Sequence, residues 1–129
     1  MVRGASAIVG LLFVALGVVG YMEFGFEDAL VAEAGQQVLV FGVSPILNVV
    51  HVLLGAALFV GALIGAVPAR RILAVVAGLL VVLALSGFVL VGNDWLNVLG
   101  LNAVDVLTYL VVAFLAFLLL GATKSAITS

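Results

Sequence analysis

The sequence predicts an all-α integral membrane protein: a four-transmembrane-helix bundle made of two parallel helical-hairpin repeats, with both termini in the cytoplasm. Three observations predict it. Apolar side chains make up 67% of the 129 residues and charged ones 8%. A soluble domain of this size has too little interior to hide so many apolar side chains from water. Charge-free runs of membrane-spanning length occur four times, and four spans place every basic residue on one side.

The four spans follow one another with little chain left for a soluble domain. A hydrocarbon core of about 30 Å requires about 20 apolar residues of helix. We expect helices at about 5–22, 45–67, 72–92 and 103–122, joined by an outer loop at 23–44, an inner loop at 68–71 and an outer loop at 93–102. Residues 1–129 therefore form a single transmembrane domain.

The charges orient these spans. Lys and Arg collect in cytoplasmic loops, and four spans place Arg3, Arg70, Arg71 and Lys124 together on that side. The acidic residues then lie at or near the outer face: Glu23, Glu27, Asp28, Glu33, Asp94 and Asp105. We expect a multi-pass protein of a bacterial or archaeal cell membrane.

The first span, from Ala5 to Met22, is expected to remain as an uncleaved helix. A small-x-small pattern, Ala32-Glu33-Ala34, resembles a signal-peptidase site but lies about a dozen residues past the apolar core, which is too far. The loop that follows offers a weak pattern for a short interfacial helix over Glu27 to Gln37.

The second span begins at Ser44-Pro45, an N-cap hydroxyl followed by proline at the first helical position. At 100° per residue, small and polar side chains share one face and apolar ones the other, so the small and polar face packs on neighbouring helices. That face carries Asn48, His51, Gly55, Leu58, Ala62 and Gly65. The run from Gly61 to Gly65 is a GxxxG pattern that serves a dimer face or an internal crossing, and we favour the crossing.

The third and fourth spans repeat the first and second. The run GLLFVAL at 10–16 resembles GLLVVLA at 78–84, and FGVS at 41–44 aligns with LGLN at 99–102, at a constant offset that pairs His51 with Tyr109. Both copies start in the cytoplasm, so they are parallel repeats about an axis along the membrane normal.

The fourth span begins with Asn102 as N-cap, and Asp105 lies where a carboxylate returns a hydrogen bond to the cap. This reading of Asp105 is preferred to a functional carboxylate. The inward face of the helix also carries Thr108, Tyr109 and Ala116.

If the second and fourth helices meet near the repeat axis, five polar side chains can form one hydrogen-bonded cluster below the outer surface: Asn48, His51, Asp105, Thr108 and Tyr109. One interpretation is interhelical packing, with neutral His51 held by Tyr109 or Asp105. The other is a proton path, ion site or ligand pocket, since ionisable residues within membranes often mark one. We favour packing, because the first and third helices supply no ionisable partner to continue a path. Close helix packing is expected at Gly55, Gly61, Ala62, Gly65 and Ala116.

Several classes of function lack support. One histidine and no cysteine cannot form a tetrahedral metal site, so we expect no metal and no cofactor. The serines lie at different depths without a neighbouring base, which argues against an enzyme. A net charge of −2 offers no basic surface for nucleic acid.

The stretch FGVSPILNVVHVLLGAALF resembles the second helix of a family of small four-helix membrane proteins of unknown function in actinobacteria and haloarchaea. Pro45, Asn48, His51 and Gly55 match its turn and Asn-x-x-His motif. The stretch LGLNAVDVLTYLVV is similar to the fourth helix of that family but has Val106 and Tyr109 where a second Asn-x-x-His is usual. The resemblance implies the four-helix fold and no activity, and the lost second pair argues against a symmetric two-histidine site.

We expect a non-catalytic structural or accessory membrane protein that contacts lipids and packs in a homo-oligomer or against other membrane subunits. The alternative is the binding or conduction of a small species, such as a proton, a quinone-like lipid or another hydrophobic ligand, through the cluster around His51.

Overall fold

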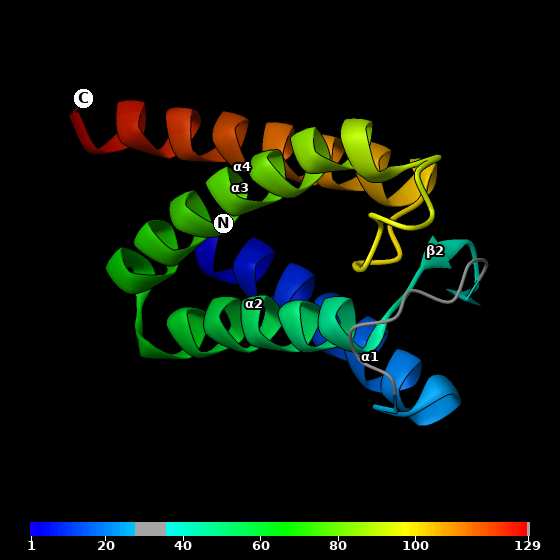
Figure 1. The fold of residues 1–129 in the computed structure, drawn as a ribbon. Helices are drawn as coiled ribbons and strands as arrows, with labels where there is room; N and C mark the ends of the chain where they lie inside the picture. Colours follow the sequence, from blue (N-terminus) through cyan, green and yellow to red (C-terminus); the bar gives the residue numbers. More distant parts are fainter. Residues whose placement is uncertain (28–35, 129) are drawn as a thin grey trace.

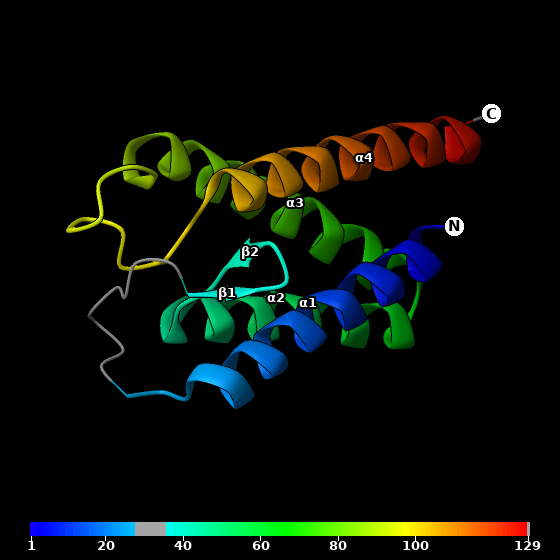
Figure 2. The same cartoon turned by 90° about the vertical axis from the view of Figure 1, so that its right-hand side faces the viewer.

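The computed structural model describes residues 1–27 and 36–128, and this part contains four helices long and apolar enough to cross a membrane, as predicted (Figure 1). They are α1 (Val2–Phe24), α2 (Pro45–Ile64), α3 (Ala66–Leu90) and α4 (Ala103–Thr128). Both termini and the α2–α3 turn lie at one end of the molecule, here called the terminal end (Figures 1 and 2). The end of α1, the start of α2 and the α3–α4 connection lie at the other end, here called the loop end.

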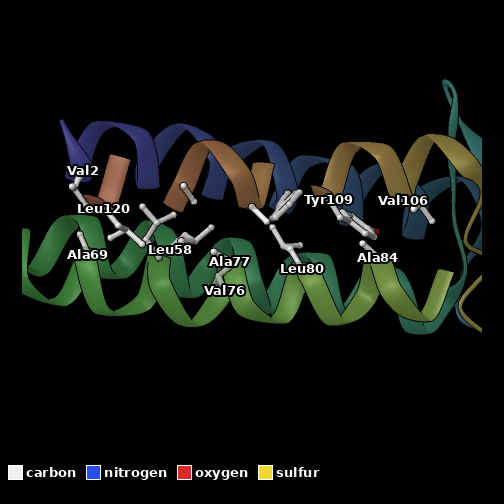
Figure 3. Close-up of a cluster of buried hydrophobic side chains, with 14 of the residues drawn as sticks. Val2, Leu58, Ala69, Val76, Ala77, Leu80, Ala84, Val106, Tyr109 and Leu120 are labelled. Atoms are coloured by element: carbon white, nitrogen blue, oxygen red, sulfur yellow. The ribbon is translucent and has the colours of Figure 1, made fainter. Parts of the chain in front are cut away.

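The helices pack as two close pairs. α1 runs along α2 and α3 along α4, while α2 packs on α3, and α1 and α4 barely approach each other. Small and branched aliphatic side chains fill the centre between the pairs (Figure 3), including Leu58, Ala69, Val76, Ala77, Leu80, Ala84 and Leu120. The unequal packing leaves one side of the molecule, between α1 and α4, incompletely closed.

The starts of α2 and α4 agree with their sequence signals. The Leu47 amide donates to the Ser44 hydroxyl over 3.0 Å, Ser44 is extended, and Pro45 is the first helical residue. α4 begins directly after its predicted cap, Asn102. Both helices thus satisfy amides of their first turn that have no partner within the helix.

The boundary between α2 and α3 differs from the prediction, which placed an inner loop at 68–71. α2 ends at Ile64 and α3 begins at Ala66, so the two helices are joined by Gly65 alone. Pro68 lies within the first turn of α3, where a missing amide hydrogen is tolerated. The Arg70–Arg71 pair is helical because α3, with 25 residues, is longer than the roughly 20 that the hydrocarbon core requires.

A short hairpin lies at the loop end between α1 and α2 in the chain. β1 (Gln37–Val38) pairs antiparallel with β2 (Phe41–Gly42), with Gln37 opposite Gly42. Its turn residue Leu39 has a positive φ of 56°, a conformation that costs a leucine about 1–2 kcal/mol. The interfacial helix considered over 27–37 falls mainly on residues outside those described, and its last residue is a strand residue instead.

Candidate functional site

His51 is fully buried at the centre of the loop-end half and is bonded to α4. Its Nε2 lies 2.6 Å from the Tyr109 hydroxyl oxygen, and its ring stacks on Phe13 of α1 with centroids 5.5 Å apart. The ring of a neutral histidine carries one N–H, and Nδ1 has no partner. If the Tyr109 hydroxyl donates to Nε2, the Nδ1 hydrogen alone is unpaired. If Nε2–H donates to the hydroxyl oxygen instead, both the hydroxyl hydrogen and the Nδ1 lone pair are unpaired. The Tyr109 hydroxyl is therefore the donor. His51 joins three helices through one hydrogen bond and one ring stack.

Asp105 joins the hairpin to the start of α4. Its Oδ2 accepts hydrogen bonds from the Asn102 amide at 2.8 Å and from the Gly42 amide at 3.0 Å. The first bond is the predicted return bond to the cap. The second crosses 63 positions of sequence and connects β2 to α4. Asp105 is fully buried, and its Oδ2 lies with two backbone amide donors at the N-terminus of α4, a position that favours a carboxylate.

Asn102 completes this connection from the surface side. Its side-chain oxygen accepts from the amides of Val104 and Asp105, and its Nδ2 donates to the Val40 carbonyl over 2.9 Å. One N-cap residue thus serves both the helix and the hairpin turn. Sequence reasoning identified the cap but missed its contact with the hairpin, because two strands of two residues each give no alternating pattern to recognise.

The five polar residues do not form the single hydrogen-bonded cluster expected from sequence. His51 and Tyr109 are bonded to each other, whereas Asp105 accepts from backbone amides, and Asn48 and Thr108 bond to none of these three. Asn48 is buried against Gly20 of α1, and its side-chain nitrogen and oxygen have no partner among the described residues. Glycines at positions 17 and 20 let α1 approach α2 closely at this level, and the carboxamide occupies that space. Thr108 is half-buried and lies on the α1 side of α4.

A groove of about 560 Å³ opens between α1 and α4 at the loop end. Its walls are almost entirely apolar, and it is bounded by the following side chains: Val9, Leu12, Phe13, Ala15, Leu16, Val19, Glu23, Val38, Leu39, Phe41, Thr108, Tyr109 and Val112. Phe13 and Tyr109, which hold His51 behind them, form part of the wall. No residue pattern predicts this groove, because its width depends on how far apart two helices pack.

The predicted packing residues fall into two groups. A Cβ on Gly55 would meet the Gly10 carbonyl of α1, and one on Gly61 would lie 2.6 Å from the Ile72 side chain of α3. The GxxxG pattern therefore contributes Gly61 to an internal crossing, whereas Gly65 forms the turn and packs in no helix. Ala62 and Ala116 are buried.

Cationic side chains fasten the terminal end. Arg3 Nε donates to the Ala62 carbonyl over 2.7 Å and so satisfies the last turn of α2. Arg70 donates to the Leu120 carbonyl over 2.7 Å and to the Thr123 hydroxyl, which links α3 to α4. The Arg3 bond places positive charge at the C-terminal end of α2, where the helix dipole favours it.

A family model described as a domain of unknown function (DUF4383) matches residues 3–122. No curated protein and no solved structure matches the chain.

Proposed function

The chain belongs to the DUF4383 family of domains of unknown function, which covers nearly its whole length, and from that premise we propose a non-catalytic structural or accessory role within the membrane. In this proposal the polar side chains of the core hold the helices together. The apolar outer surface packs against copies of the same chain or against other membrane subunits. The distribution of the family over actinobacteria and haloarchaea is part of the same proposal.

One observation carries it: the buried polar groups at the loop end are separated from the terminal end by a layer of apolar side chains, and Figure 3 draws that layer. Below the His51–Tyr109 bond, the described core consists of aliphatic side chains, among them Leu58, Val76, Ala77, Leu80 and Ala113. Beyond that layer, the buried polar residue among those described is Ser6, in the second turn of α1. Such a layer opposes conduction of protons or ions, which need a chain of polar groups or water.

We also infer that the terminal end faces the cytoplasm of a prokaryotic cell. Arg3, Arg70, Arg71 and Lys124 belong to the helix ends gathered there, while Glu23, Glu27 and Asp94 belong to the loop end. An excess of Lys and Arg on one side is the usual determinant of orientation, which supports cytoplasmic termini.

The duplicated hairpin is a further part of the proposal, supported by contacts between equivalent segments. A Cβ on Gly42 would meet the Gly100 carbonyl, and one on Gly100 would lie 2.6 Å from the Val43 carbonyl. These residues belong to the aligned runs 41–44 and 99–102. His51 and Tyr109, equivalent by the same offset of 58, are bonded to each other. Contacts between equivalent positions are expected beside a two-fold axis between two repeats.

Native mass spectrometry on protein released gently from its own membrane tests the structural role. Multiples of 13.2 kDa, or complexes with other chains, are the expected result. A matched comparison uses His51→Gln, which should lower stability modestly and leave the assembly mass unchanged. A chain that is monomeric in every mild detergent and in lipid nanodiscs would contradict the proposal.

A further inference from the structure

The apolar part of the groove between α1 and α4 is about as long as one lipid leaflet is thick. Along α1 its apolar lining extends from Val9 to Val19, ten steps of about 1.5 Å that add up to about 15 Å, and Glu23 lines it one further turn towards the loop end. Half of a hydrocarbon core of about 30 Å is also about 15 Å. The apolar part of the groove is therefore about as long as one leaflet of the hydrocarbon core is thick, and the hairpin residues Val38 and Phe41 also line it.

The groove is open to the surrounding lipid. Leu12 on α1 and Leu39 at the hairpin turn line it and are 63% and 87% exposed. Its volume of about 560 Å³ lies within the range of roughly 300–1,000 Å³ that ligand sites occupy. The hydrophobic effect does not drive a lipid from the bilayer into an apolar groove, because both surroundings are apolar. A lipid is therefore retained only where its hydrocarbon chain fills a shaped void and its headgroup is bound. The groove supplies the void.

The mouth of the groove is acidic. Glu23, exposed in the last turn of α1, is the charged residue among the lining side chains. Asp94 is exposed at the same end, and the four basic residues belong to the opposite end. A headgroup with net negative charge is repelled by this arrangement, and an amine is attracted to it. Thr108 adds a hydroxyl to the wall below.

We propose that this groove is a binding site for one hydrocarbon chain of a membrane lipid whose headgroup carries an amine and no net negative charge. The chain lies along α1 and is enclosed by α4 and the hairpin, and the amine lies beside Glu23. This site is distinct from the role in assembly proposed above. It also differs from a ligand between α2 and α4, because His51 and Tyr109 are bonded to each other there.

Two pairs of variants test the site. Ala15 lines the groove and is exposed, so Ala15→Phe fills the void without removing a core side chain, and Ala57→Phe places the same bulk on an exposed position of α2 outside the groove. Glu23→Lys reverses the charge at the mouth, and Glu27→Lys makes the same change on an exposed residue that does not line it. Each protein is equilibrated in nanodiscs of equal phosphatidylethanolamine and phosphatidylglycerol with the same chains, then released for native mass spectrometry.

The expected result is one retained phosphatidylethanolamine per chain in the unaltered protein. A phenylalanine at position 15 occupies the space in which the hydrocarbon chain of the lipid packs. Ala15→Phe should therefore lower the fraction of protein that retains a lipid by about tenfold, while Ala57→Phe leaves that fraction unchanged. Glu23→Lys should shift retention towards phosphatidylglycerol, and Glu27→Lys should not. The proposal is overturned by no retained lipid, by equal retention in both phenylalanine variants, or by equal retention of both lipids.

A second copy of the chain in the groove is a separate outcome that also overturns it. In that case the unaltered protein is a dimer without lipid, and Ala15→Phe converts it to monomer. Because oligomer masses and lipid masses are read in the same spectra, failure of the lipid site is distinguishable from failure of the assembly role.

Discussion

Replacement of Asp105 by alanine should loosen the hairpin and the start of α4 together. The carboxylate oxygen Oδ2 accepts from the amides of Gly42, which is buried, and Asn102, which is half-buried. A buried amide left without an acceptor costs about 1–3 kcal/mol, and the partly exposed one costs less because water can reach it. We therefore expect Asp105→Ala to lower the free energy of unfolding by about 2–4 kcal/mol.

The equivalent cap of α2 provides the matched control. Ser44 accepts one hydrogen bond, from the Leu47 amide, so Ser44→Ala should cost about 1 kcal/mol. Stability is measured by denaturant titration in mixed micelles, and hydrogen exchange is followed at Gly42. Exchange at Gly42 should accelerate in Asp105→Ala and remain as in the unaltered protein in Ser44→Ala. Equal costs for the two variants, with Gly42 still protected, would show that the carboxylate does not hold the hairpin.

The remaining predictions concern contacts between helices. A double-mutant cycle of His51→Phe and Tyr109→Phe should give a coupling energy of about 0.6 kcal/mol and at most about 1.7, and independent costs would contradict the bond. Arg70→Ala should cost about 1.5–3 kcal/mol in the same unfolding titration, because two bonds to α4 are lost, whereas exposed Arg71→Ala should change stability by less than about 0.5. Gly55→Ala places a methyl group against the backbone of α1 and should destabilise by about 1–3 kcal/mol, and unchanged stability would mean that α1 and α2 are not in close contact there.

The number of helices and the starts of α2 and α4 could be predicted because each depends on local chemistry. Apolar run length gives the spans, and Ser44-Pro45 and Asn102 carry their capping signals in the adjacent residues. The α2–α3 boundary was misplaced because the arginine pair was interpreted as loop, although helix can extend past the hydrocarbon core. A charge indicates depth in the membrane better than it indicates secondary structure.

The site was predicted in part for the same reason. The inward direction of His51 follows from helical periodicity, and its closeness to Tyr109 follows from the repeat offset. The direction of the Asn48 side chain could not be predicted from either pattern, because it depends on the space that Gly20 leaves on another helix. The groove depends on the separation of α1 and α4, a quantity that no residue pattern encodes.

The long-range bonds of the loop end also determine the order in which the protein matures during synthesis. His51 and Gly42 find their partners 58 and 63 positions further along the chain. Before α4 is made, the first helical pair should therefore have no hydrogen-bond partner for the His51 ring and no carboxylate to hold the hairpin. A nascent chain that ends before residue 103 should be the form most exposed to membrane quality control, since its interior polar groups have no partners of their own.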